Sequence, residues 1–363
     1  MTSVAGTRFQ AIRRWQALAI VLLTFGLMLG SLNFVMPTKT VQPVLVRDVK
    51  TPSKVVIDRN PDLVLYRAIN ARMDTGEGYY HAAAAEQRTQ GYPLRPFVTF
   101  RLPTLALMQH YFGSAAMTGL IWALIIAVTL AWWGRLKGAF ADPGRRVIGV
   151  MLIISGLTLA ARPELVVVHD NWAGLLVSLS LAIYRPGKAL PSIVIALAAV
   201  LIREIALPYM LLMAAFAVGH QRWRELLGWA IAVALFTVAM VLHAHAVAGV
   251  LLPSDPASQG WAVIGGWPFF DLAMRLCTAL RALPVSMGAA LVPLAILGWA
   301  AWASDTGLRG LLLIAGYMLI LMVIGRPENF YWGLIIAPAF LLGFAFMPLA
   351  VADLWTALRR ADT

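Results

Sequence analysis

Ten long apolar runs recur along the chain, and they constrain its fold more than any other feature of the sequence. They cover residues 17–35, 115–133, 147–168, 172–184, 189–202, 205–219, 226–250, 283–302, 308–324 and 331–351. A helix needs about 20 residues to cross the hydrocarbon core of a bilayer. Several runs are shorter than that, so we expect tilted or broken helices there. The pattern predicts an all-α polytopic membrane protein with about ten transmembrane helices.

Composition favours the same fold class. The chain of 363 residues is 60% hydrophobic and only 13% charged, whereas about 25% of the residues in soluble domains are charged. Its formal net charge of +12 would suggest nucleic-acid binding in a soluble protein. Here, basic residues in short loops that fix membrane topology explain the charge, so we expect no nucleic-acid partner. The single cysteine, Cys277, excludes an intrachain disulfide.

Charge sorts the connections between the apolar runs into two groups. Lysines and arginines gather in the N-terminus, in the C-terminal tail and in four short loops, 134–146, 185–188, 220–225 and 304–310. Short basic loops of this kind stay in the cytoplasm. Acids, asparagines and aromatic residues mark the other group, 162–172, 203–204, 252–267 and 326–333. Because the number of spans is even, both termini are predicted to be cytoplasmic.

Residues 36–113 are predicted to form one large external segment, inserted between the first two spans of a single membrane domain, 1–363. The last part of this segment, 95–113, is apolar enough to suggest a further span. However, Pro96 and Arg101 interrupt it, and a span here would move the first basic loop to the outside. We therefore interpret 95–113 as a helix that lies at the outer interface or dips into the membrane.

The external segment contains the sequence signals of two short helices. Asn60 can cap a helix that begins at Pro61, and Gly76 and Gly78 would end it. One face of this helix carries three apolar residues spaced four apart, Leu65, Ile69 and Met73. A second helix is predicted over 79–90, closed by the glycine and proline that follow.

Asp62 is the first acid of this helix, with Tyr66 one turn further on the same face. An acid in the first turn stabilises a helix by about 0.3–1 kcal/mol through the helix dipole, which is one explanation for Asp62. The other is a general base at the membrane surface, with Tyr66 as its hydrogen-bond partner. Glu77 is a competing acid. It lies between two glycines, where it either decorates a turn or binds a sugar hydroxyl.

The segment resembles the first external loop of the GT-C class of membrane glycosyltransferases, of the mannosyltransferase and aminoarabinose-transferase type, which use polyprenyl-phosphate sugar donors. The resemblance lies in Asp62 at a helix start, Tyr66 a turn later, the tyrosines at 79–80 and the stretch YPLRPFVTFRLPTL at 92–105. Leu63 follows Asp62 where many relatives carry a second acidic or polar group. This departure leaves open whether Asp62 or Asp58 is the base and whether a metal binds.

The resemblance implies transfer of a sugar from a lipid-linked donor to a glycan, lipid or protein acceptor by an inverting displacement. Asp62 would be the catalytic base. The residues expected to bind donor or acceptor are Tyr66, Glu77, Tyr80, Arg95, Arg101, Asp170, Arg203, Glu204, Arg326 and Asn329. The cofactor remains open between none and a divalent cation, Mg²⁺ or Mn²⁺. Membrane lipids would surround the protein in the inner (plasma) membrane of a bacterium, with a periplasmic active site.

Each of these residues also has a structural interpretation. Arg203 and Glu204 could simply pair with each other, Asp170 could cap a helix, and Arg95 and Arg101 could extend to lipid headgroups. The principal alternative function is a membrane transporter or a flippase for lipid-linked sugars. Transporters usually carry internal repeats and charges near the bilayer midplane, and neither is visible in this sequence. A non-catalytic scaffold would not concentrate acids and arginines on one side.

Overall fold

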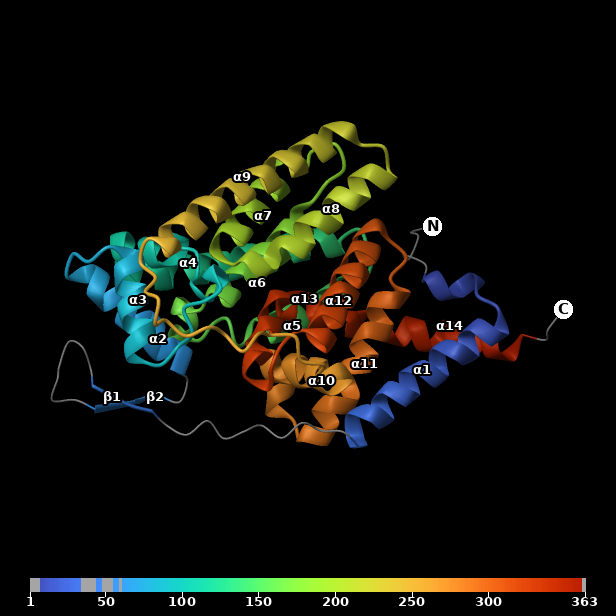
Figure 1. The fold of residues 1–363 in the computed structure, drawn as a ribbon. Coiled ribbons are helices and arrows are strands. Elements are labelled where there is room, and N and C mark those ends of the chain that lie inside the picture. Colours follow the sequence, from blue (N-terminus) through green and yellow to red (C-terminus); the bar gives the residue numbers. More distant parts are fainter. Residues whose placement is uncertain (1–6, 34–43, 48–54, 59–60, 361–363) are drawn as a thin grey trace.

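The computed structural model describes residues 7–33, 44–47, 55–58 and 61–360 (Figure 1). These residues are mostly helical, and the backbones of β1 (Val44–Arg47) and β2 (Val55–Asp58) form an antiparallel pair. The α-helices are α1 (Arg14–Asn33), α2 (Pro61–Asp74), α3 (Tyr79–Thr89), α4 (Thr104–Leu136), α5 (Pro143–Leu157), α6 (His169–Ile183), α7 (Leu190–Ile202), α8 (Leu207–Gly219), α9 (Trp223–Ala248), α10 (Gly266–Cys277), α11 (Val285–Ala301), α12 (Asp305–Val323), α13 (Ala337–Phe340) and α14 (Met347–Arg359). Short 3₁₀ helices connect them, namely η1 (Arg8–Ala11), η2 (Phe97–Thr99), η3 (Pro163–Val167), η4 (Glu204–Ala206), η5 (Ala279–Ala282), η6 (Pro327–Ile335) and η7 (Leu341–Ala345).

Several helices have the length and composition of membrane spans. Four stretches in the described part of the chain qualify. They are α1, α9, α12 and the region Phe97–Leu136, which includes α4. A fifth is added if η6 and the stretch Ala337–Ala345, bent by 63° against each other, count as one broken span. Three of the other predicted spans correspond to shorter apolar helices in the structure, Leu190–Ile202, Glu204–Gly219 and Val285–Ala301. The chain therefore has the character of a membrane protein, while the number of ten spans remains a prediction.

Two predicted spans are interrupted in the structure. The run 147–168 is α-helical to the end of α5 at Leu157, and Pro163 later opens η3. The run 331–351 is divided among η6, α13, η7 and α14, with Pro338 and Pro348 in the first turns of the last two α-helices. A proline suits the first turn of a helix because the N–H it lacks has no partner within the helix there. Whether each of these runs crosses the membrane stays a prediction.

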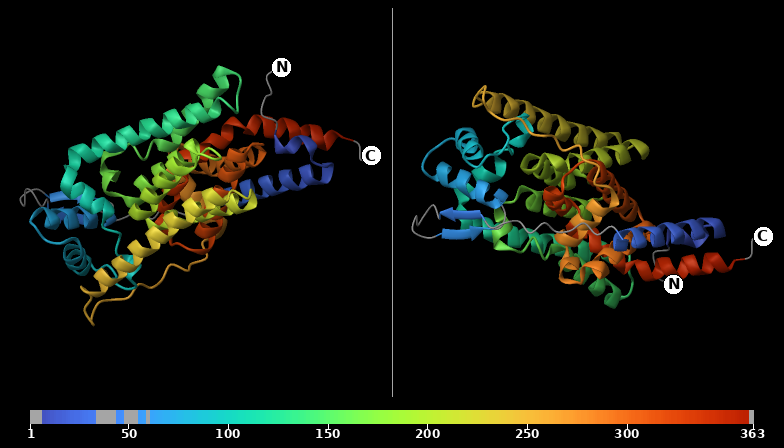
Figure 2. Two further views of the ribbon diagram at one scale, coloured as in Figure 1. Left: turned by 90° about the horizontal axis from the view of Figure 1, so that it is seen from above. Right: turned by 60° about the horizontal axis from the view of Figure 1, so that its bottom comes forward.

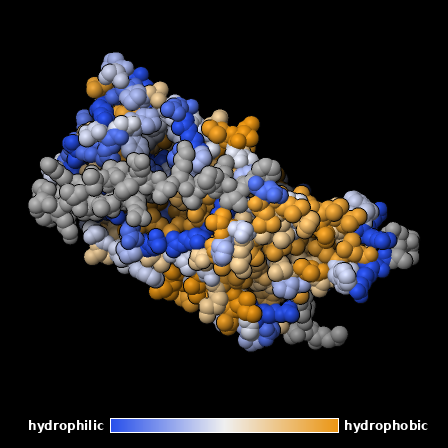
Figure 3. Space-filling model, turned by 90° about the horizontal axis from the view of Figure 1, so that it is seen from below, coloured by the Kyte–Doolittle hydropathy of each residue, from blue (hydrophilic) through white to orange (hydrophobic). Residues whose placement is uncertain are grey.

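The helices form an elongated bundle, and different helices pack together at its two ends. The long helix α9 lies along α7 and α8, and α4 packs against α6 (Figure 1). Helices α1 and α14 lie side by side at the end where both chain termini are found (Figure 2). In the view of Figure 3, apolar side chains cover the surface between a hydrophilic end around α2 and α3 and a second hydrophilic patch near the termini. Exposed apolar residues such as Leu23, Leu130 and Leu242 suit a lipid surface.

The two helices predicted in the external segment are confirmed. The apolar face of α2, formed by Leu65, Ile69 and Met73, is buried in one cluster with residues of α3, and α2 packs against α3 and α4. Further on, Gly113 has a φ of 75° and interrupts α4, so that 104–112 and 114–136 are separate helical pieces. This break coincides with the predicted boundary between the interfacial segment and the second span. Glycine suits this position because a side chain disfavours positive φ.

Helix α10 is a buried helix that the apolar runs of the sequence do not predict. Asp271 and Arg275 interrupt its apolar pattern, which hides it from a search for apolar runs. In the structure they pair with each other at 2.8 Å, and Ser31 of α1 donates a hydrogen bond to Asp271. The Trp267 indole N–H in turn donates to Ser31. These hydrogen bonds satisfy Asp271 and join α10 to α1, whereas Arg275 Nη2 is buried without a partner among the described residues.

The two groups of connections that charge distinguishes in the sequence lie at opposite ends of the bundle. At one end, Arg203 contacts Asp170, and Arg101 contacts Glu204. At the other, Tyr184 donates a hydrogen bond to Glu225. Helix α6 runs from the first cluster to the second. A common site requires the acidic and aromatic connections to lie at the same end of the bundle, and the contacts of Arg203 and Arg101 meet this requirement.

A close approach of Gly298 in α11 to Gly343 in η7 generates a prediction about packing. A Cβ atom on Gly298 would lie 1.8 Å from the Gly343 carbonyl oxygen, whereas Gly316 of α12 has open space around its Cβ position. We expect Gly298→Ala to lower the free energy of unfolding by about 1–3 kcal/mol or more, because the backbones must separate. Gly316→Ala, the matched control, should be neutral or slightly stabilising. Thermal unfolding in detergent micelles measures both, and equal melting of the two variants would contradict the described packing.

Candidate functional site

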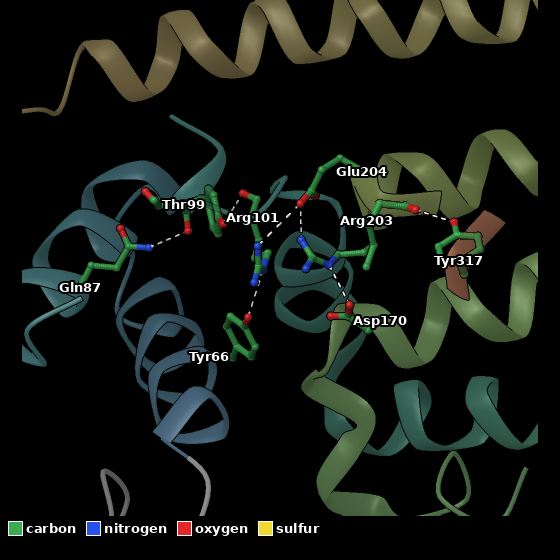
Figure 4. A network of polar contacts seen from close by, with 10 residues as sticks. Tyr66, Gln87, Thr99, Arg101, Asp170, Arg203, Glu204 and Tyr317 are labelled. Atoms are coloured by element: carbon green, nitrogen blue, oxygen red, sulfur yellow. Dashed lines mark hydrogen bonds and ion pairs between the residues drawn. The ribbon is translucent and has the colours of Figure 1, made fainter. Parts of the chain in front are cut away.

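The site lies where α2, the segment after η2, the start of α6 and the turn between α7 and α8 meet (Figure 4). The chain leaves α7 at Arg203, whose backbone is extended, and turns through η4 into α8. Pro208 in the first turn of α8 favours this new helix start. The turn directs Arg203 and Glu204 toward Asp170 in the first turn of α6.

Arg203 is almost completely buried, with 1% of its side chain exposed, and so is Asp170. The Arg203 Nε donates a hydrogen bond to Asp170 Oδ1 at 3.0 Å, and its Nη1 donates to Glu204 Oε1. The guanidinium also faces the Trp332 ring. Its Nη2 is buried without a hydrogen-bond partner among the described residues. An unpaired N–H of a buried cation is costly, so this atom is a candidate ligand contact.

Arg101 brings the α2 region into the same network. Its Nε donates a hydrogen bond to the Tyr66 hydroxyl at 3.1 Å, and its Nη1 lies 3.7 Å from Glu204 Oε1. Glu204 is therefore shared between two arginines (Figure 4). Desolvation of Tyr66 raises its pKa, so the phenol is protonated at neutral pH.

An apolar cavity of about 360 Å³ opens beside the two arginines. Its polar lining comes mainly from Arg101, Arg203 and Glu204. The rest is formed by the start of α8, the end of α12 and the rings of Trp261, Tyr317 and Trp332. An apolar volume that ends at two guanidinium groups suits a ligand with an apolar tail and an anionic head.

A second, smaller cleft of about 40 Å³ shares Arg101 with the apolar cavity. It contains Asp62, whose Oδ1 accepts a hydrogen bond from the Tyr92 hydroxyl at 2.7 Å. Burial and the nearby Asp62 charge raise the Tyr92 pKa, which keeps this hydroxyl a donor. Gln87 Oε1 and Thr99 Oγ1 also belong to residues of this cleft, and neither has a hydrogen-bond partner among the described residues. The cleft thus combines a carboxylate with polar atoms suited to ligand hydroxyl groups.

Five of the residues predicted to bind substrate meet in this network, namely Tyr66, Arg101, Asp170, Arg203 and Glu204. Asp62 shares its cleft with Tyr66 and Arg101. Sequence reasoning did not single out Gln87 or Tyr317, since nothing in their sequence context sets them apart. Tyr92 and Thr99 lie in the stretch 92–105 that carries the resemblance, but they were not predicted as site residues. It also missed the ring of His169, which packs edge-on against Tyr66 with both nitrogens buried and unpartnered in the described structure.

The other predicted site residues line neither cavity. Glu77 pairs with Arg72 at 3.0 Å, and the Tyr80 hydroxyl lies 3.1 Å from His243 Nδ1. Three more residues make backbone contacts: Arg95 donates to the Leu252 carbonyl, and Asn329 Oδ1 accepts from the Arg326 N–H. The side chain of Asp58 lies outside the described residues. Within the described ranges, no group of three or more His, Cys, Asp or Glu side chains is placed to hold a metal ion.

The loop between α9 and α10 holds Trp261 over the apolar cavity. Arg88 of α3 donates two hydrogen bonds, of 2.7 and 2.8 Å, to the carboxylate of Asp255 in this loop. The Ser258 N–H donates to the Arg95 carbonyl, and the Gly325 N–H donates to the Trp261 carbonyl. These contacts tie one wall of the cavity to α3 and to the end of α12.

Comparison with protein-family models, with curated proteins and with solved structures gives no match for this chain. The chemistry of the two adjoining cavities is therefore the basis on which a function can be assigned. One is an apolar volume beside two guanidinium groups, the other is a cleft with a carboxylate, and Arg101 lines both.

The ion pair between Arg88 and Asp255 predicts that the stability of the fold depends on pH. Hydrogen bonds from Arg88 lower the pKa of Asp255 to about 2, from about 3.9 in an unfolded chain. Because the folded-state pKa is depressed, the stability from this pair is fully present above about pH 4 and is lost as the pH falls toward about 2. We expect Asp255→Asn to melt below the wild type near neutral pH, and the two melting temperatures to converge as the pH is lowered. A gap that stays constant down to about pH 2.5 would contradict this assignment.

Proposed function

We propose that this protein is a membrane glycosyltransferase of the GT-C kind, which moves a sugar from a polyprenyl-phosphate donor to an acceptor hydroxyl. The observation that carries the proposal is the position of Arg101. It lines both the apolar cavity and the cleft with Asp62. A donor of this class has an apolar tail, a phosphate and a sugar in that order, and the two cavities offer partners in the same order.

The arginines would bind the phosphate of the donor. Guanidinium groups recognise phosphate through paired, charge-assisted hydrogen bonds. The buried, unpartnered Nη2 of Arg203 supplies a donor for this purpose, and the apolar wall of the cavity accepts the first isoprene units. As the bond between the anomeric carbon and the phosphate oxygen breaks, negative charge grows on the phosphate, and cations fixed in a poorly solvated site stabilise that charge.

Asp62 would act as the general base. The acceptor oxygen attacks the anomeric carbon from the side opposite to the phosphate, which inverts the configuration, and Asp62 takes its proton. The hydrogen bond from Tyr92 orients the carboxylate, while Gln87 and Thr99 offer contacts to sugar hydroxyls. A bound Mg²⁺ or Mn²⁺ would add positive charge at the phosphate. Whether one takes part remains open in this proposal.

The proposal includes a topology. Ten spans would place both termini in the cytoplasm and the site at the periplasmic face of a bacterial inner membrane. The location of the cavity favours a transferase over a transporter or flippase. It is bounded by the start of α8 and the end of α12, hence by helix ends, whereas transporter sites lie near the bilayer midplane between repeats.

The test compares Asp62→Asn with Asp74→Asn. Both acids lie in α2. Asp62 accepts a hydrogen bond from the Tyr92 hydroxyl, and Asp74 contacts His110 Nδ1. Asp74, however, is largely exposed and lies outside the site. Asparagine at 62 can still accept the Tyr92 hydrogen bond but cannot take a proton. We expect Asp62→Asn to lower turnover by about 10²–10⁴-fold and Asp74→Asn to have little effect.

The reaction is measured as release of free polyprenyl phosphate from a panel of polyprenyl-phosphate-linked sugars, in membranes that contain the native acceptors. This readout follows the leaving group, so it works whichever acceptor takes the sugar. Wild-type turnover in a folded Asp62→Asn protein would remove Asp62 from the base role, and Asp58 and Glu77 would then be tested. If the wild type releases no lipid phosphate from any donor, the proposed function is wrong.

A further inference from the structure

Glu204 occupies the position between the two arginines that an anionic ligand would take. Its Oε1 accepts from Arg203 Nη1 and lies 3.7 Å from Arg101 Nη1. The same side chain lines the apolar cavity. With Asp170, it balances the charge of the two guanidinium groups, so the network is neutral without a ligand.

The two acids of this network differ in their surroundings. Asp170 is 1% exposed and holds Arg203 Nε from the bundle side, away from the lining of the cavity. The side chain of Glu204 is 19% exposed and lies on the ligand side. Asp170 is thus a fixed partner, whereas Glu204 can withdraw from the arginines without leaving a charge buried.

We propose that Glu204 is an internal counter-ion, which the phosphate of the lipid carrier displaces and which promotes release of that phosphate after transfer. This inference rests on the proposed function and assigns Glu204 a role in product release. During transfer, the acceptor oxygen forms a bond to the anomeric carbon and its proton passes to Asp62. The bond from that carbon to the phosphate oxygen breaks, and its electron pair stays on the phosphate.

The reaction changes the charge that the arginines must hold. The donor is a phosphodiester with one negative charge, and the product is a phosphomonoester that carries about 1.5 to 2 at neutral pH. Two arginines without a competing carboxylate would hold the product more tightly than the donor. Glu204 competes for the same N–H groups and re-forms its contacts as the lipid phosphate leaves, which limits this product trapping.

The experiment measures binding of polyprenyl phosphate and of a polyprenyl-phosphate-linked sugar, the latter without acceptor, to detergent-solubilised wild type and Glu204→Gln. Glutamine keeps the acceptor oxygen but removes the charge. We expect Glu204→Gln to bind polyprenyl phosphate about 10–100-fold more tightly, the equivalent of one hydrogen bond to a charged group. Its affinity for the donor should rise less. Its turnover should fall, with stronger inhibition by added polyprenyl phosphate.

Glu86→Gln is the matched control. Glu86 is similarly shielded, with 13% of its side chain exposed, and pairs with Arg72 at 2.5 Å, but it lines neither cavity. Its removal should leave the ratio of product to donor affinity unchanged. Glu204→Asp, which keeps the charge but withdraws it by one methylene, should show an intermediate ratio. This variant tests the proposal if the glutamine variant does not fold.

The outcomes separate the two proposals. If the wild type binds polyprenyl phosphate and catalyses transfer, but the Glu204 variants bind the product no more tightly relative to the donor, the counter-ion role is overturned and the transferase stands. If the wild type binds neither lipid, the proposed function fails as well. A general structural defect would weaken the binding of both ligands together and leave the ratio of their affinities unchanged. That result would also count against the counter-ion role.

Discussion

The buried pair of Arg203 and Asp170 is the interaction on which the site depends. A guanidinium with 1% exposure is costly unless a carboxylate compensates it, and removal of one partner from a buried pair costs about 3–5 kcal/mol. The pair joins the first turn of α6 to the turn between α7 and α8. It therefore fixes the place where η4 crosses the end of the bundle, and with it one wall of the apolar cavity. The charged groups are rigid before any ligand arrives, which is the condition for electrostatic stabilisation of a developing charge.

Arg101 extends this fixed point to the helices α2 and α3. Its hydrogen bond to Tyr66 connects a residue of the polar end to the bundle, and the packing of α2 against α3 and α4 keeps that helix in place. Asp62, one turn before Tyr66, is held by Tyr92 from the segment after α3. The Tyr92 hydroxyl holds the carboxylate of Asp62, and Arg101 holds Tyr66 one turn further along α2. Asp62, Tyr66 and Arg101 line the same small cleft.

The sequence predicted the helices of this end and most of the charged residues that meet there, because capping signals, glycines and charge at span ends are local properties. Asp62 and Tyr66 were recognisable from their spacing, and Arg203 and Glu204 from their place between two apolar runs. What could not be predicted is which polar groups are satisfied by the fold. Arg95 and Asn329 make backbone hydrogen bonds, Tyr80 contacts His243, and these partners are far apart in sequence. Gln87 and Thr99 are noticeable only because the fold buries Gln87 Oε1 and Thr99 Oγ1 without hydrogen-bond partners among the described residues, and α10 only because its charges pair internally.

The neutrality of the ligand-free network links its stability to its chemistry. Two arginines alone, at the wall of an apolar cavity, would repel each other in a poorly solvated place and would destabilise the end of the bundle. Two fixed acids would remove that cost but would leave no attraction for a phosphate. One buried acid and one acid on the cavity side satisfy both conditions. In the proposed mechanism, a phosphate that replaced Glu204 would keep the arginines paired throughout. The different burial of Asp170 and Glu204 would then reconcile a stable bundle with a site that binds an anionic lipid.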